Sequence, residues 1–242
     1  MKRARGNEVP THPPSIQRDV GWQFNFNQHV RLTLVQQQEQ SMKAYTFNLR
    51  EDMRTHTVTY TIVLINIIVF TVLNLFPETR NVLLLDPHRV MEAPWTVISV
   101  FFSHEMLIHI VLNMGVLLPF GRRLERIVGG GKLLSVYGLC GFLGSLTIIP
   151  FADVIQWIGP VVGASAAVYG VVAALSAIEP DKIIMKGAIK HWALALFIGN
   201  ALLLMIDPTA MIGGPAHAIG LIAGYFLGQW LKPQTFIQRE IA

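Results

Sequence analysis

The stretch Gly163-Ala-Ser-Ala-Ala-Val-Tyr-Gly170 places a serine among small residues at the start of an apolar run. A serine in such a run is common, and it usually bonds back to its own backbone. Two other stretches share this arrangement. Ala216-His217-Ala-Ile-Gly220 puts a histidine at the start of another apolar run, and His109-Ile-Val-Leu-Asn113 puts a histidine and an asparagine near the start of a third. These three runs decide which fold and which chemistry are open to the chain.

The composition predicts an all-α membrane protein. Of the 242 residues, 52% are hydrophobic and 14% are charged, whereas a soluble domain carries about 25% charged residues. A spanning helix needs roughly 20 apolar residues, and backbone groups inside a bilayer must be satisfied within the segment, which favours helices. Six runs of about that length are present, over residues 58–76, 105–121, 133–151, 162–178, 189–206 and 215–231.

The basic residues predict how these six helices cross the membrane. All of the 19 Lys and Arg residues except Arg80 and Arg89 lie in the N-terminal segment, in the connections after the second and fourth runs, or in the tail. By the positive-inside rule both termini are cytoplasmic. We therefore expect a cytoplasmic N-terminal extension over residues 1–57, a six-helix membrane domain over 58–232 and a cytoplasmic tail over 233–242.

The same distribution argues against two other interpretations of the sequence. Basic residues in short segments between apolar runs indicate topology rather than a nucleic-acid-binding patch. The first 57 residues contain no apolar core of the signal-peptide type, so the first spanning helix is expected to serve as an uncleaved anchor. The bilayer is the expected environment, and the sequence leaves the oligomeric state open.

The polar residues of the three runs share one depth in this topology. The second, fourth and sixth helices all run from outside to inside, and His109, Asn113, Ser165 and His217 each lie a few residues into one of them. At about 1.5 Å per residue, all four are expected in the outer part of the membrane. Polar residues scattered independently over six helices would seldom share one level.

Small residues predict that the fourth and sixth helices pack together. They recur every four residues on both helices, a spacing that lets backbones approach closely in lipid. One stripe comprises Ala166, Gly170 and Ala174, and the other comprises Ala216, Gly220, Gly224 and Gly228. If the stripes face each other, Ser165 and His217 come within reach.

This grouping favours nucleophilic catalysis. A serine hydroxyl becomes a good nucleophile when a histidine takes its proton. No acidic residue accompanies His217 in its run, so a dyad rather than a triad is expected. Tyr169, one turn below Ser165, either orients the imidazole or is an ordinary core aromatic.

An oxyanion formed at the serine would need hydrogen-bond donors. His109 and Asn113 are four residues apart and so lie on one helix face, and the backbone N–H of Ser165 is a third donor. The alternative for an intramembrane His or Asn is a simple interhelical hydrogen bond.

Over residues of about 58 to 231 the chain resembles the rhomboid intramembrane serine proteases. The resemblance rests on the His109-xxx-Asn113 pair, on Gly163-x-Ser165 followed by Tyr169, and on Ala216-His217-xx-Gly220. It implies a six-helix rhomboid-like bundle with Ser165 as nucleophile and His217 as general base and then acid. His109, Asn113 and the Ser165 N–H would form the oxyanion hole, and Gly163 would keep the loop before the serine open.

The resemblance also implies a substrate class and a location. The family cleaves single-pass membrane proteins near the outer membrane surface, so transmembrane protein substrates are the expected partners, and the plasma membrane is the expected site. Glu125, just before Gly129-Gly-Gly131, resembles the family's turn after the second helix. Trp95 matches the Trp of the family's Trp-Arg pair, but Thr96 follows in place of Arg, so the contact that anchors this loop must differ.

Other patterns exclude competing chemistry. His104-Glu105 with His109 is not a zinc-protease helix motif, because that motif needs histidine at position 108, where the chain has Ile. No metal and no cofactor is expected. Two rival functions remain: a catalytically inactive rhomboid-like protein that binds membrane clients, and a transporter or proton channel that uses His109 and His217. A transporter would be expected to show internal repeats and midplane sites.

Overall fold

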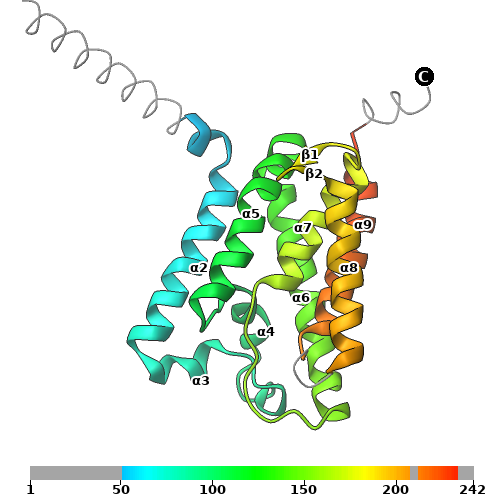
Figure 1. Ribbon diagram of the computed structural model, residues 1–242. Coiled ribbons are helices and arrows are strands. Elements are labelled where there is room, and N and C mark those ends of the chain that lie inside the picture. Colours follow the sequence, from blue (N-terminus) through cyan, green and yellow to red (C-terminus); the bar gives the residue numbers. More distant parts are fainter. Residues whose placement is uncertain (1–50, 208–211, 234–242) are drawn as a thin grey trace, which may run out of the picture. The chain divides into compact units, whose positions relative to one another are not determined.

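This computed structural model describes residues 51–207 and 212–233, and helices lying side by side make up most of that part of the chain (Figure 1). The chain divides into two compact units, residues 1–51 and 52–242, and the description below concerns the second. The predicted cytoplasmic extension over residues 1–57 and tail over 233–242 lie almost entirely outside the described residues.

Within the described residues, each of the six apolar runs forms a helix, as predicted. The helices are α2 (Thr57–Leu75), α5 (Leu107–Val128), α6 (Gly130–Val154), α7 (Ser165–Ile178), α8 (Ile189–Ile206) and α9 (Gly214–Leu231). Short elements connect them: η1 (Pro77–Thr79), α3 (Arg80–Leu83), η2 (Pro87–Arg89), α4 (Thr96–Ser99), η3 (Val100–Phe102) and the hairpin strands β1 (Ile183–Ile184) and β2 (Gly187–Ala188).

Four of these helices, α2, α5, α6 and α8, are long and apolar enough to cross a membrane. The described part of the chain is thus helical, with several candidate spans, as a rhomboid-like bundle requires. α7 has 14 residues and is shorter than this length. The number of spans and the side on which the termini lie remain predictions.

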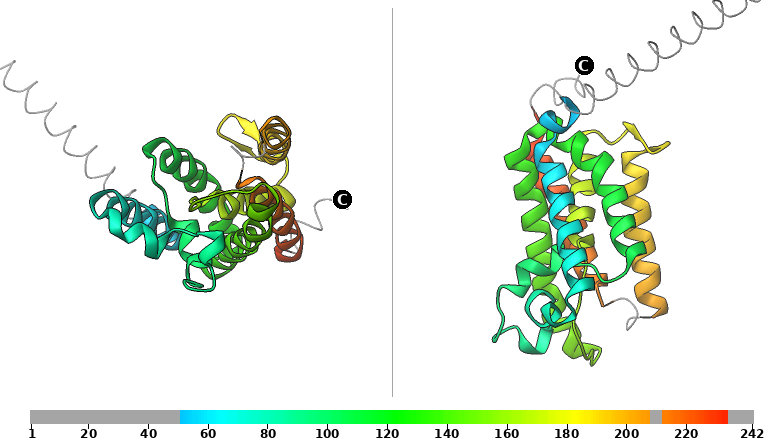
Figure 2. Two further views of the ribbon diagram at one scale, coloured as in Figure 1. Left: turned by 90° about the horizontal axis from the view of Figure 1, so that it is seen from below. Right: turned by 90° about the vertical axis from the view of Figure 1, so that its left-hand side faces the viewer.

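α7 is the central helix. It lies among α5, α6, α8 and α9 and packs against them (Figures 1 and 2). Every one of its residues except Ser165 and Tyr169 is buried. At about 1.5 Å per residue, α7 is about 21 Å long and the 25-residue α6 about 37 Å. α7 therefore begins well inside the bundle, and the preceding connection runs inward to reach it.

The seam between α7 and α9 is formed by backbone against backbone. A Cβ atom built at three glycines of α9 would lie 2.2–2.3 Å from a carbonyl oxygen of α7, which is far inside van der Waals contact. The pairs are Gly220 with Ala166, Gly224 with Gly170, and Gly228 with Ala174. The predicted facing of the two small-residue stripes is confirmed.

Glu125 ties the end of α5 to the start of α2. Its buried carboxylate accepts hydrogen bonds from the backbone N–H groups of Val58 and Thr59, both at 2.9 Å, and from the Thr59 hydroxyl at 2.6 Å. The first N–H groups of a helix lack intrahelical partners and carry partial positive charge, so a carboxylate there is stabilising. The predicted turn follows at Gly129, and α6 begins at Gly130.

The loop between α2 and α5 is held by other contacts than the family's Trp-Arg pair. The Trp95 indole N–H donates to the Val82 carbonyl at 2.8 Å. Thr96 is buried, and its hydroxyl donates to the Ala93 carbonyl at 2.6 Å. Threonine thus closes a local turn, and Trp95 fastens the loop together with Ser99, whose hydroxyl donates to the Leu83 carbonyl at 2.8 Å.

Candidate active site

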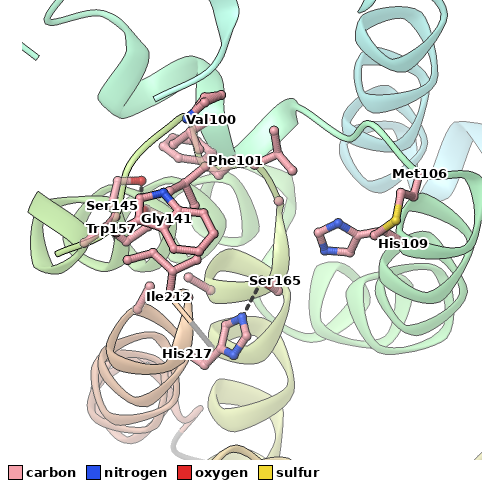
Figure 3. A pocket seen from close by; sticks show the side chains of 18 residues that line it. Val100, Phe101, Met106, His109, Gly141, Ser145, Trp157, Ser165, Ile212 and His217 are labelled. Atoms are coloured by element: carbon pink, nitrogen blue, oxygen red, sulfur yellow. Dashed lines mark hydrogen bonds between the residues drawn. The ribbon is translucent and has the colours of Figure 1, made fainter. Parts of the chain in front are cut away.

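A cavity of about 300 Å³ lies beside the start of α7, where α5, α6, α7 and α9 meet (Figure 3). Its polar lining includes Ser165 and His217 from the starts of α7 and α9, and His109 from α5. Apolar side chains form much of the remaining wall, among them Phe101, Met106, Ile148, Trp157 and Ile212. The first turns of α5, α7 and α9, which the sequence predicted to lie at one depth, therefore line the same cavity.

Ser165 and His217 are joined directly. Ser165 Oγ lies 2.6 Å from His217 Nε2, a short hydrogen bond between side chains 52 residues apart (Figure 3). The α7–α9 seam fixes this distance, because Ala166 and Gly220 lie next to the two residues in sequence or one turn away. The predicted approach of the two side chains is confirmed.

The connection before α7 is fastened to the rest of the bundle close to Ser165. Leu85 and Val161 form an antiparallel bridge, and the Gly163 N–H donates to the Val100 carbonyl at 3.2 Å. Gly163 has φ +132°, a conformation that side chains with a Cβ rarely adopt. The glycine thus lets the chain turn sharply into α7.

Gly163 also leaves room for His109. A Cβ atom at Gly163 would lie 2.8 Å from His109 Cε1 and 3.1 Å from His109 Nε2. The His109 ring in turn packs edge-on against the His104 ring, with the centroids 4.9 Å apart. His109 therefore lines the cavity on the side of Gly163, next to the serine.

The start of α7 supplies backbone donors at the same place. Its first intrahelical bond runs from the Val168 N–H to the Ala164 carbonyl at 2.9 Å. The N–H groups of Ser165, Ala166 and Ala167 come before this bond and have no carbonyl of their own helix to bond. Together with the helix dipole, they favour negative charge at Ser165.

Asn113 lies elsewhere in this structure. Its side-chain amide donates to the His109 carbonyl one turn earlier at 3.0 Å, and Asn113 is not among the residues that line the cavity. Asparagine in a helix can satisfy its amide on a carbonyl of the preceding turn. The role of Asn113 in an oxyanion hole with His109 therefore stays a prediction. To fill that role, the Asn113 side chain would have to adopt a different rotamer.

Tyr169 contacts the histidine of the pair. Its ring centroid lies 4.7 Å from that of His217, with the planes inclined by 35°. The tyrosine is one turn below Ser165 on α7, so the sequence spacing did place it within reach. It restricts the tilt of the imidazole from one face.

Asn200 was not predicted from the sequence. Its Oδ1 lies 2.9 Å from His217 Nδ1, and its Nδ2 donates to the Gly214 carbonyl at 3.0 Å. The signal available in the sequence was a single asparagine inside the apolar run 189–206. Such a residue is unusual in a membrane helix and commonly bonds another helix, but nothing in the run indicates which helix.

The arrangement can support acyl transfer: a hydroxyl bonded to an imidazole, backbone donors beside it, and a cavity wall that is largely apolar. Among the residues that the structure describes, no three His, Cys, Asp or Glu side chains are grouped closely enough to hold a metal ion.

Comparison with known proteins agrees on one family. The model of the rhomboid domain matches residues 91–234, which include Ser165, His217 and His109. The chain is 33% identical to "RHOMBOID-like protein 6, mitochondrial" of Arabidopsis thaliana over 156 residues, which are 62% of this chain and 49% of the relative. It is 24% identical to "Rhomboid protease GluP" of Bacillus subtilis over 204 residues, which are 81% of this chain and 38% of the relative.

Another relative carries a different description. "Inactive RHOMBOID-like protein 8" of Arabidopsis thaliana is 31% identical over 132 residues, which are 52% of this chain and 34% of the relative. The chain spans half or less of the length of these three relatives. The domain match covers more than half of the chain itself, and the apolar helices agree with an integral membrane protein. The chain belongs to the rhomboid family.

Proposed function

We propose that this protein is an intramembrane serine endopeptidase that works through a Ser165–His217 dyad. The observation that carries the proposal is the 2.6 Å contact between Ser165 Oγ and His217 Nε2 at the edge of a cavity of about 300 Å³. Two side chains 52 residues apart meet there with the geometry of a nucleophile and its base.

In the first half of the reaction Ser165 Oγ attacks the scissile carbonyl while His217 Nε2 takes the hydroxyl proton. The carbonyl oxygen becomes an oxyanion. The Ser165 N–H and the start of α7 are placed to stabilise it, and His109 lines the same cavity. Asn113 joins them if its amide leaves the His109 carbonyl.

Collapse of this intermediate breaks the peptide bond and leaves an ester on Ser165. His217 gives its proton to the leaving amine, and the N-terminal fragment remains attached as the acyl group. A water molecule then attacks the ester with His217 again as base, and the second fragment leaves as a carboxylic acid. No cofactor enters these steps.

The proposed substrates are single-pass membrane proteins cut near the outer membrane face. The family resemblance supports this class, and so does the position of Ser165 inside the bundle at the start of the short α7. The proposal includes six spans, both termini in the cytoplasm and a place in the plasma membrane. Lipid and a transmembrane substrate helix are then the direct partners.

A second function is favoured by one finding, the similarity to a relative described as inactive. A rhomboid-like protein without catalysis would bind membrane clients at the same cavity. Such a protein needs neither a serine nor a histidine in hydrogen-bond contact, and this chain has both.

Labelling with a fluorophosphonate probe separates the two functions. The probe forms a covalent bond with a serine only where a base activates it. We expect the detergent-solubilised native protein to be labelled, and both Ser165→Ala and His217→Ala to lose the label. Ser176→Ala is a matched control, because Ser176 is buried on the same helix and donates to the Ala173 carbonyl.

The proposed function predicts that Ser176→Ala keeps the label. A native sample that is monodisperse and hydrolyses no transmembrane reporter protein, and that also stays unlabelled, would instead favour client binding. Labelling that survives in Ser165→Ala would place the reactive residue elsewhere and would contradict the dyad.

A further inference from the structure

Asn200 is a buried polar residue on α8, whose other residues apart from Ile189 are partly or largely exposed. Among the 18 residues of α8 only Ile189 and Asn200 are buried, and the apolar side chains of Leu194, Phe197 and Leu202 are about half exposed. An amide turned inward from such a helix needs hydrogen-bond partners, because an unsatisfied polar group is costly away from water. Among the described residues the Asn200 amide has two such partners, and both belong to the start of α9.

The two hydrogen bonds determine the orientation of the amide. The Gly214 carbonyl can only accept, so the Asn200 group 3.0 Å from it must be the NH₂. The oxygen of Asn200 therefore faces His217 Nδ1 at 2.9 Å. With the amide reversed, two acceptors would face each other at Gly214, so the geometry leaves one assignment.

This orientation in turn determines where the imidazole carries its proton. Asn200 Oδ1 has no hydrogen to give, so His217 Nδ1 must hold one and donate it. In a neutral imidazole the other nitrogen is then free of hydrogen, and that nitrogen is Nε2, 2.6 Å from Ser165 Oγ. Nε2 is thus the acceptor for the serine proton, which is the form that a general base requires.

We propose that Asn200 is a positioning residue that holds His217 in this tautomer and in register with Ser165. It takes the place that an aspartate holds in the Ser-His-Asp triad, but as a neutral group. The effect of Asn200 on catalysis rests on the proposed peptidase function. The assignment of the His217 tautomer does not, because it follows from the hydrogen bonds alone.

A simpler role would be that Asn200 only ties α8 to α9. Two substitutions distinguish the roles. Asn200→Asp keeps an oxygen that accepts from Nδ1–H and loses the donor to Gly214, whereas Asn200→Leu loses both. A positioning role predicts that Asp rescues what Leu destroys, and a simple tie predicts that both fail alike.

The experiment uses the full-length protein with ¹⁵N-labelled histidine in lipid nanodiscs, with His217→Ala identifying the His217 signals. In the native protein we expect a protonated Nδ1 and an unprotonated Nε2. Asn200→Leu should mix the two tautomers and lower kcat on a transmembrane reporter by about 10- to 100-fold, a part of the roughly 100- to 10,000-fold that a general base supplies. KM should stay unchanged, and Asn200→Asp should restore most of kcat.

Asn66→Leu is the matched control. Asn66 is also buried and bonded on a spanning helix, to the Ile62 carbonyl at 2.8 Å and the Tyr137 hydroxyl at 3.4 Å. Its loss should lower thermal stability and leave the His217 nitrogen signals as they are. A native protein with Nε2 protonated would overturn the inference, as would native kcat and an unchanged tautomer in Asn200→Leu.

Two further outcomes keep the tests separate. If the native protein neither cleaves the transmembrane reporter nor reacts with a fluorophosphonate, the proposed peptidase function is wrong. The ¹⁵N spectrum of His217 still tests whether Asn200 holds the imidazole in the Nδ1–H tautomer. If Asn200→Leu does not fold, the native spectrum and Asn200→Asp decide instead. An Asp variant that folds but loses the Nδ1–H tautomer would overturn the inference.

Discussion

A methyl group at Gly163 would meet the His109 ring, because the Cβ position lies 2.8 Å from His109 Cε1. We expect Gly163→Ala to lower turnover by at least about 10-fold, by displacing a ring that lines the cavity. Backbone strain at φ +132° should also cost about 1–3 kcal/mol of stability. Turnover of a transmembrane reporter and the melting temperature measure the two effects.

Gly159→Ala separates strain from contact. Gly159 also has positive φ, at +116°, but nothing lies within 4 Å of its Cβ position. Its alanine variant should lose stability and keep turnover. Equal turnover in both variants would mean that the space beside His109 does not matter for catalysis.

Asn113 offers a test of the oxyanion hole. Loss of one oxyanion donor typically lowers kcat by ~100- to 1,000-fold, whereas loss of the nucleophile abolishes turnover through the dyad. We therefore expect Asn113→Ala to retain more activity than Ser165→Ala in the reporter assay. Equal and complete inactivation of two folded variants would contradict the roles proposed for them.

Contacts between individual site residues could be predicted from the sequence where both residues lay at the same depth in the membrane. Ser165, His217 and Tyr169 could be placed together because Ser165 and Tyr169 lie one turn apart on α7, and His217 lies at a matching position along α9. Asn200 could not be placed, since its partners at Gly214 and His217 depend on how α8 rotates about its axis. The hydrogen bond from the Asn113 amide to the His109 carbonyl could not be predicted either, because the spacing of residues in the sequence does not determine a side-chain rotamer.

Among the helices, the start of α2 depends on a residue from α5. Glu125→Gln removes the charge that three donors from Val58 and Thr59 share. We expect a loss of about 1–3 kcal/mol, the usual cost of disturbing a buried group with charge-assisted hydrogen bonds. Thermal unfolding in detergent measures it.

Glu92→Gln is the corresponding surface control. Glu92 pairs with Arg89 at 2.9 Å, and both side chains are more than half exposed. Exposed ion pairs contribute about 0–1 kcal/mol, so its melting temperature should hardly change. An equal loss in both variants would show that the hydrogen bonds of Glu125 are not what stabilises α2.

Asp52 gives the contact between α2 and α5 a dependence on pH. Partial burial raises the pKa of Asp52, but the Tyr60 hydroxyl at 2.5 Å and the Arg122 guanidinium at 2.7 Å outweigh it, and the net pKa is lowered. A lowered folded pKa stabilises the protein above the unfolded value of about 3.9. This stabilisation is lost as pH falls through the folded pKa.

Melting temperatures of native protein and Asp52→Asn, measured from pH 7 downward, test this contact. The native protein should melt higher at neutral pH, and the difference should shrink once pH falls below about 4. A difference that stays constant down to pH 2 would show that the charge of Asp52 does not contribute.

Helix bounds could be predicted from hydropathy to within three residues, except where polar residues continue a helix. α8 coincides with the apolar run 189–206, but α5 continues seven residues past the predicted end at 121. Intrahelical hydrogen bonds do not require apolar side chains, so the helix goes on through Arg122 and Arg123 until the glycines at 129–131.

For the whole molecule, the predicted topology can be tested by labelling introduced cysteines, because the one native cysteine, Cys140, is not expected to react. Cys140 is fully buried, so the native chain should not react with a membrane-impermeant maleimide. Met91→Cys, at a position 91% exposed, should be labelled from outside intact cells. Lys182→Cys should be labelled only after the membrane is opened, and the reverse pattern would invert the topology.

The seam of α7 and α9 also bears on how proteins of this kind can diverge. Because backbone lies against backbone at Gly220, Gly224 and Gly228, no side chain there can vary, and the distance from Ser165 to His217 is inherited with the three glycines. The cavity wall is under no such restriction: Met106 and Ile212 line it without taking part in the seam. Descendants of this sequence, or variants selected in the laboratory, can therefore change what the cavity accepts while the spacing of its reactive pair passes on unaltered.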